Sequence, residues 1–271
     1  MGGILCSMAF VVGGGDLILT VVYDNNPYAE GLETRWGFSC LVQGAEETIL
    51  FDTGGEGAVL LSNMEKLRVD PMEVDGVVLS HIHGDHTGGL SAFLKCHPHV
   101  TVYLPASFPE RFKRGVRDYG AKVVEVHGPT QIGRYIYSTG EMGTTIQEQA
   151  LVIRTTQGLV VITGCAHPGV VAMVKKAKEM LEGQVALVMG GFHLSGTDPA
   201  RIGEIVADFK ALGVEKVAPC HCSGDVARRV FKEAYGDHFI PAGVGMRLEI
   251  KGAFEAMGRM PSSWGEVKKG S

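Results

Sequence analysis

The stretch Ser80–Gly89, SHIHGDHTGG, places three histidines and one aspartate within six consecutive positions. The four residues are His81, His83, Asp85 and His86. Imidazole and carboxylate groups are common metal ligands. Capping of a helix would require only one Ser or Asp at this point, so capping does not account for the three histidines. The stretch therefore predicts a metal site.

The apolar run DGVVLS (75–80) directly precedes this stretch and predicts a buried strand. In an extended chain, residues two apart point the same way, so His81 and His83 can hold one ion. Gly84 is expected to permit a turn, after which Asp85 and His86 can face a second ion. Two ions held close together can bind an oxygen-rich substrate and activate water.

Three more histidines follow predicted strands. His167 ends a hairpin predicted over 148–169, His193 ends a strand over 185–194, and His221 ends a strand over 214–224. Ligand-binding groups gather at the ends of strands in α/β sheets, so these residues are expected near the first cluster. For His193, a place in the core and a place lining the pocket both remain open.

The rest of the chain alternates between strand-like and helix-like segments. Strands are expected over 17–24, 37–44, 48–55, 100–106, 121–128 and 246–250, and helices over 56–69, 107–120, 170–181, 198–213 and 225–236. A further helix is expected to begin in TGGLSAFLK (87–95). A length of 271 residues suits one α/β domain built from two halves. We place that domain at 1–251, with 1–15 as an N-terminal extension and 252–271 as a loose tail.

Composition narrows the function classes. The net charge is −5 and no basic run is present, which argues against nucleic acid as a partner. The apolar N-terminus carries no positive charge and is too short for a membrane span or a good signal peptide, so a cytoplasmic protein with no membrane partner is expected. Cys220 and Cys222 flank His221, which suggests metal or redox chemistry in a reducing compartment.

The motif His-x-His-x-Asp-His after a buried strand resembles the metallo-β-lactamase superfamily. Upstream, FDTGG (51–55) resembles the first motif of that superfamily, in which the aspartate, here Asp52, supports the metal-binding loop. The resemblance extends from residue 17 to residue 250. It implies a four-layer αββα sandwich, in which two sheets are flanked by helices and the site lies at one sheet edge.

Later motifs resemble one branch of the superfamily. TGCAHPG (163–169), GGFHL (190–194) and PCHCSG (219–224) are similar to the branch of the archaeal dihydropterin-methyl-ribofuranosylaminobenzene-phosphate synthase and related metal-dependent hydrolases. The resemblance implies that His221 binds the second metal ion.

The chain also departs from the common pattern of the superfamily. Cys165 stands where many members have a bridging aspartate, and the segment 138–149 lacks the usual histidine. His167 is our choice for the missing ligand. Cys165 either replaces the bridging ligand, leaves that position vacant, or is a small buried residue.

The resemblance implies a metal-dependent hydrolase with two divalent ions, zinc first and manganese or iron as alternatives. A phosphate ester or a diphosphate-bearing small molecule is the expected anionic substrate. Asp85 would act as ligand and proton acceptor, and His193 would stabilise the leaving group. Alternatives are a pterin-type transferase that displaces diphosphate, a di-iron redox protein, and a binding protein without catalysis. Cys220 and Cys222 are expected to point away from His221 and either to pack or to support the ligands from behind, without binding the metal themselves. Asp24 and Asn25 are expected at the pocket floor.

Overall fold

The computed structural model describes residues 15–254, which form two β-sheets packed face to face. The seven-stranded sheet has the order β13 (Arg247–Ile250), β1 (Leu17–Asp24), β2 (Phe38–Gln43), β3 (Ile49–Phe51), β4 (Gly76–Val78), β5 (Thr101–Pro105) and β6 (Lys122–Val126). The six-stranded sheet has the order β12 (Val214–Cys220), β11 (Val185–Gly191), β10 (Gly158–Thr163), β9 (Leu151–Thr155), β8 (Ile136–Ser138) and β7 (Thr130–Gln131).

Each sheet has an antiparallel and a parallel part. Strands β13, β1, β2 and β3 pair antiparallel, whereas β3 to β6 pair parallel. In the second sheet β7 to β10 pair antiparallel, and β10, β11 and β12 pair parallel. Because parallel strands end at the same sheet edge, the loops after β3 and β4 and those after β10, β11 and β12 are brought together.

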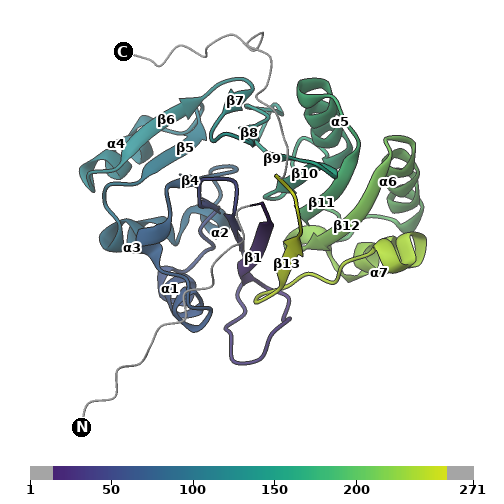
Figure 1. Ribbon diagram of the computed structural model, residues 1–271, viewed down its shortest axis with the longest axis horizontal. Coiled ribbons are helices and arrows are strands. Elements are labelled where there is room, and N and C mark those ends of the chain that lie inside the picture. Colours follow the sequence, from purple (N-terminus) through teal and green to yellow (C-terminus); the bar gives the residue numbers. More distant parts are fainter. Residues whose placement is uncertain (1–14, 255–271) are drawn as a thin grey trace.

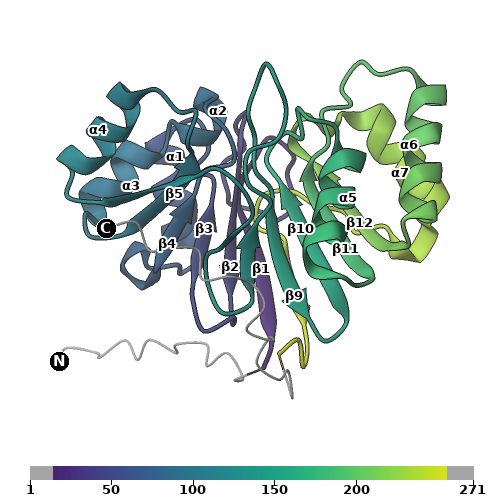
Figure 2. The same cartoon turned by 90° about the horizontal axis from the view of Figure 1, so that it is seen from above.

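Helices cover the outer face of each sheet, which gives four layers (Figures 1 and 2). The first sheet is covered by α1 (Gly57–Lys66), α3 (Leu90–Cys96) and α4 (Glu110–Asp118). The second is covered by α5 (Val170–Leu181), α6 (Pro199–Ala211) and α7 (Asp225–Tyr235). The short helix α2 (Gly84–Thr87) lies within the histidine-rich stretch, and single 3-10 turns occur at η1 (Pro71–Glu73), η2 (His221–Ser223) and η3 (Gly236–His238).

Alternation of side chains along the strands builds the layers. In β10, Val160 and Ile162 pack between the two sheets, whereas Leu159 and Val161 pack outward against α5, α6 and α7. Residues two apart on a strand share a face, so one apolar strand supplies both cores. This arrangement confirms the predicted αββα fold.

The structure adds two details to the sequence prediction. The helix expected to begin in 87–95 begins at Leu90 as α3, and the separate short helix α2, which ends at Thr87, was not predicted. Strands β7 and β8 were not predicted, since they are only two and three residues long. The predicted extension and tail lie almost wholly outside the described residues, so the boundaries of the domain stay a prediction.

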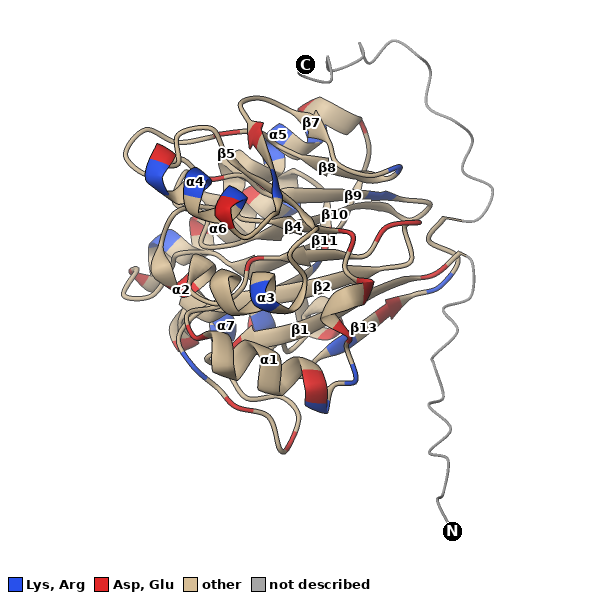
Figure 3. Cartoon of the chain, turned by 90° about the vertical axis from the view of Figure 1, so that its left-hand side faces the viewer, with Lys and Arg blue, Asp and Glu red and all other residues tan. Residues whose placement is uncertain are grey.

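Figure 3 shows that basic and acidic residues are interspersed along the helices, strands and loops. No helix within residues 15–254 is long and apolar enough to cross a membrane.

Candidate metal centre

The predicted site residues converge from four loops at one edge of the sandwich. The loop after β4 and helix α2 supply the first motif, and the loops after β10, β11 and β12 supply the remaining side chains. Contacts join these side chains into one cluster: His81, His83, Asp85, His86, Cys165, His167, His193 and His221.

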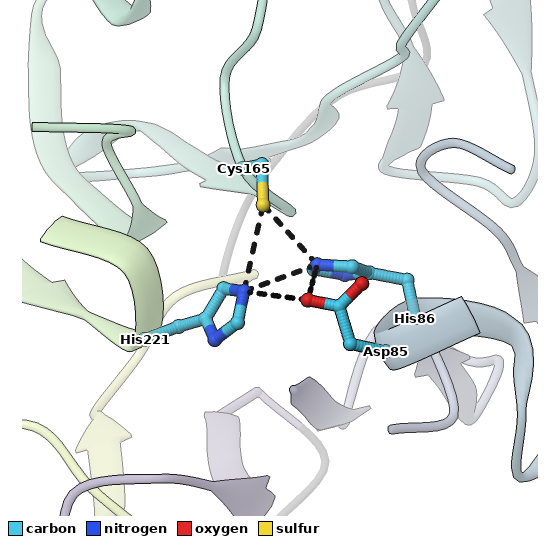
Figure 4. A group of neighbouring side chains, drawn as sticks. All are labelled: Asp85, His86, Cys165 and His221. Atoms are coloured by element: carbon cyan, nitrogen blue, oxygen red, sulfur yellow. Dashed lines mark hydrogen bonds and ion pairs between the residues drawn. The ribbon is translucent and has the colours of Figure 1, made fainter. Parts of the chain in front are cut away.

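Four of these side chains direct their ligand atoms at one point: Asp85, His86, Cys165 and His221 (Figure 4). His86 Nε2 lies 3.2 Å from His221 Nε2, and Cys165 Sγ lies 3.3 Å and 3.4 Å from these two atoms. Asp85 Oδ2 lies 3.4 Å from His221 Nε2 and 3.6 Å from His86 Nε2. In a tetrahedral site with bonds of about 2.0–2.3 Å, ligand atoms are separated by about 3.3–3.8 Å. The group therefore has the dimensions of a four-coordinate metal site.

A second group lies on the other side of Cys165. Ligand atoms of His81, Cys165 and His167 all lie within 4.8 Å of one another. The His83 ring lies 4.7 Å from the His81 ring and 4.9 Å from the His167 ring. Cys165 therefore belongs to both groups of potential ligand atoms.

One ring nitrogen of His81 lacks a hydrogen-bond partner within residues 15–254, which is independent evidence for a ligand at this second group. Its Nδ1 lies 2.9 Å from Ser80 Oγ, but its buried Nε2 has no hydrogen-bond partner among the described residues. A buried polar atom without a partner is costly, and a metal ion at Nε2 would satisfy it. The residues present therefore fit a metal ion at this second group.

Asp52 orients His86, as the resemblance implied. One carboxylate oxygen accepts a hydrogen bond of 2.7 Å from the Ser80 backbone N–H. The other lies 2.7 Å from both Ser80 Oγ and His86 Nδ1, which leaves His86 Nε2 facing the four-atom group. Burial raises the pKa of Asp52 to about 7, although His81 and Ser80 act to lower it. A carboxylate behind a metal-binding histidine fixes its ring and its tautomer.

Glu148 has the corresponding role for His167, and the sequence did not reveal it. Its Oε1 accepts hydrogen bonds of 2.8 Å from the backbone N–H groups of Cys165 and Ala166. Its Oε2 lies 2.9 Å from the His167 backbone N and 2.8 Å from His167 Nδ1. Burial alone would raise the pKa of Glu148, but the hydrogen bond with His167 and the charge of His81 lower it to about 2. No motif marks this residue, which is one glutamate in a polar segment before β9.

Asn25 holds His221 in a similar way. Its Oδ1 lies 2.9 Å from His221 Nδ1, and its Nδ2 donates to the His221 carbonyl oxygen at 3.2 Å. His221 Nε2 is therefore turned toward the four-atom group. The expected place of Asn25 at the pocket floor stays a prediction.

The charge states suit metal ligands. Burial and the neighbouring His86 lower the pKa of His81 to about 3, and burial and the neighbouring His221 lower that of His86 to about 4. Burial acts to raise the pKa of Asp85, but hydrogen bonding with His221 and the charge of His86 outweigh it, so the pKa falls below its usual range. Two neutral imidazoles and a carboxylate result, which are the forms that bind metals.

Cys222 lies closer to the site than a continuous strand would place it. We expected it to point away from His221, and its Sγ lies within 4.8 Å of both the Cys165 Sγ and a ring nitrogen of His193, while its thiol donates to the Cys165 carbonyl oxygen at 3.7 Å. The reason is that β12 ends at Cys220, and the η2 turn then breaks the two-residue alternation. Cys220 packs between the sheets, as expected.

His193 is exposed, so it does not occupy the core. Its ring lies 4.5 Å from that of His167, at the open side of the cluster. Its backbone adopts a left-handed conformation with φ of 54°, and Asp52, Ala166 and His221 do so with φ of 57°, 64° and 47°. Left-handed backbone is uncommon for residues other than glycine and gathers at functional sites.

Residues 37–176 match the family model of the metallo-beta-lactamase superfamily. The chain belongs to this superfamily. A 7,8-dihydropterin-6-methyl-4-(beta-D-ribofuranosyl)-aminobenzene-5'-phosphate synthase from Methanocaldococcus jannaschii is 30% identical, over 82% of this chain and 92% of that protein. An uncharacterized protein from the same organism is 26% identical, over 76% of this chain and 91% of its own length.

Solved structures agree with this membership. The crystal structure of Tm1679, a metal-dependent hydrolase of the beta-lactamase superfamily, is 31% identical and has a TM-score of 0.75. The match covers 86% of this chain and 99% of that chain. A diphosphatase from the PhnP family shares the fold at 15% identity, with a TM-score of 0.58 over 87% of this chain and 97% of its own. The predicted superfamily and its synthase-related branch are thereby confirmed.

Proposed function

We propose that the protein is a metal-dependent hydrolase with a dinuclear site, which acts on a phosphate ester or a diphosphate-bearing small molecule. The observation that carries this proposal is the pair of ligand groups that share Cys165. The relative from Methanocaldococcus jannaschii is named as the synthase of an aminobenzene-5'-phosphate, which supports a phosphate-bearing substrate. A small anionic substrate, no nucleic-acid or membrane partner, and a cytoplasmic location are parts of the same proposal.

Each ion would have its own protein ligands. His81, His83 and His167 would hold the first ion, and the second would be held by Asp85, His86 and His221, with Cys165 shared. Imidazole, thiolate and carboxylate together suit zinc, and manganese and iron are the alternatives that metal analysis would distinguish.

Two divalent ions at this position would polarise the phosphoryl oxygens and make a water molecule more acidic. The chain itself supplies the remaining roles. Asp85 stays ionised because its pKa is low, and the carboxylate is the form that would serve both as a charged ligand and as a proton acceptor. His193 is exposed at the open side beside His167, where its imidazole can donate a hydrogen bond to the leaving group.

A transferase reaction is the second candidate, because the relative that is 30% identical is named a synthase. The same ligand set would then bind a diphosphate leaving group, while an aromatic nucleophile replaces water. A di-iron redox protein is the third, and the soft ligand Cys165 is the feature that favours it. Iron with a visible absorption band in the purified protein would support the redox alternative over both phosphate reactions.

Hydrolysis is tested with the zinc-loaded and the manganese-loaded protein and bis(4-nitrophenyl) phosphate as substrate. His81→Ala and Asp85→Ala are expected to abolish release of 4-nitrophenol. The control is His127→Ala, which removes an exposed histidine outside the cluster and is expected to leave the rate unchanged. Full activity in the first two variants would contradict the site.

A further inference from the structure

Trp36 presents an exposed indole beside the candidate metal centre. The residue is 57% exposed, although tryptophan is usually largely buried. Its ring centroid lies 4.9 Å from that of His221, with the two planes tilted by 53°. Within residues 15–254, Trp36 is the one aromatic side chain other than histidine that makes such a ring contact with a predicted metal ligand.

The backbone on both sides of Trp36 is fixed against the metal-binding loops. The Arg35 N–H donates to the Asp24 carbonyl oxygen at 3.3 Å, and Arg35 Nε lies 3.7 Å from Glu56 Oε1. Gly37 has φ of 139°, and a side chain there would collide with the Asp85 carbonyl oxygen. The chain after Trp36 therefore passes directly against the loop that carries Asp85, which places the backbone of Trp36 beside the metal centre.

We propose that Trp36 is the substrate-binding surface on which a planar aromatic ring of the substrate stacks, while its phosphate group lies at the metal ions. This inference rests on the proposed function and adds the chemical class of the substrate. An exposed aromatic face attracts another aromatic ring in an offset stack, and this attraction does not require a charged group on either ring. The contact with His221 places that face next to the ligands of the second ion.

The test measures equilibrium binding of three phosphonates, which cannot be hydrolysed, to the metal-loaded protein by calorimetry. The probes are phenylphosphonate, cyclohexylphosphonate and methylphosphonate. Wild type is expected to bind phenylphosphonate roughly tenfold more tightly than methylphosphonate, in line with one good aromatic stack. Trp36→Ala is expected to abolish this preference and to keep the affinity for methylphosphonate, whereas Trp36→Phe should retain most of the preference.

Tyr28→Ala is the matched control, because Tyr28 is 53% exposed on the same β1–β2 connection. It is expected to leave the preference unchanged, and metal content is measured for every variant. Equal binding of phenyl and methyl probes by wild type, equal binding of phenyl and cyclohexyl probes, or loss of metal in Trp36→Ala would each overturn the role of Trp36. Failure of wild type to bind any of the three would overturn the phosphate proposal together with it.

Discussion

At the scale of single residues, Asn25 decides which nitrogen of His221 faces the metal site. The account predicts that Asn25→Leu weakens binding of one zinc ion by about 10-fold to 100-fold, because the ring of His221 loses its hydrogen-bond acceptor. Competition with a chromophoric chelator measures this affinity. Asn25→Asp is the control, since it keeps an oxygen for His221 Nδ1. Unchanged affinity in Asn25→Leu would mean that Asn25 does not position the ligand.

Glu148 gives a prediction about stability. Glu148→Leu leaves the N–H groups of Cys165, Ala166 and His167 without their acceptor in a buried position. We expect the free energy of unfolding of the metal-free protein to fall by about 3–5 kcal/mol, as for other broken buried pairs. Urea unfolding in EDTA measures it. Glu148→Gln, which keeps one acceptor oxygen, should lose clearly less, and equal stability of Glu148→Leu and wild type would contradict the assigned role.

At the scale of elements, glycines control where helix α2 lies. We expected Gly84 to permit the turn, and a Cβ atom there would meet open space, so the space around residue 84 does not itself demand glycine. Glycine is required instead at Gly88, where a Cβ atom would collide with the Gly55 carbonyl oxygen of the loop after β3. Close approach of these two backbones is what brings His86 to Asp52.

The prediction is that Gly88→Ala destabilises the protein by about 1–3 kcal/mol and lowers its metal content, since α2 must move away from the loop after β3. Gly84→Ala is the matched control within the same helix and should keep both properties. Thermal unfolding and metal analysis of the two variants check this. Equal behaviour of both variants would contradict the importance of the close approach.

Some elements could be predicted from the sequence and others could not. The strands before His81, His167, His193 and His221 could be predicted because each is a buried apolar run. The ligands follow the ends of these strands. Glu148 and Asn25 were not identified as hydrogen-bond partners of ligands, because their roles depend on contacts across 19 and 196 positions. The place of Cys222 beside Cys165 and His193 could not be predicted from the two-residue alternation, because alternation holds only while the strand continues.

At the scale of the whole molecule, the buried cluster makes stability depend on pH. The pKa values of His81 and His86 fall from 6.5 to about 3 and about 4 on folding, so stability is present above pH 6.5 and is lost as the pH falls below it. The pKa of Asp52 rises from 3.8 to about 7 on folding, so this group makes the folded protein more stable as the pH falls through nearly the same interval. The raised pKa of His221 also stabilises the folded protein. Because this contribution is fully present below pH 6.5, it does not alter the trend at lower pH.

His81 and His86 lose stability over this interval and Asp52 gains it, so these three groups together predict that the metal-free protein becomes less stable between pH 6 and pH 4.5. Their combined contribution is about 1.4 kcal/mol per pH unit. Urea unfolding at a series of pH values in EDTA measures the slope. The variant Asp52→Asn removes the offsetting group and is expected to change the slope. Stability that rises steadily as the pH falls over this interval would contradict the protonation states assigned to the cluster.

The number of metal ions per chain directly tests whether the two ligand groups joined by Cys165 hold two ions. Purified protein, reconstituted with zinc and freed of excess metal, is analysed for ions per chain alongside His81→Ala and His221→Ala. The account predicts two ions per chain in wild type and fewer in each variant. Wild type that binds no metal after reconstitution, or variants that keep both ions, would contradict it.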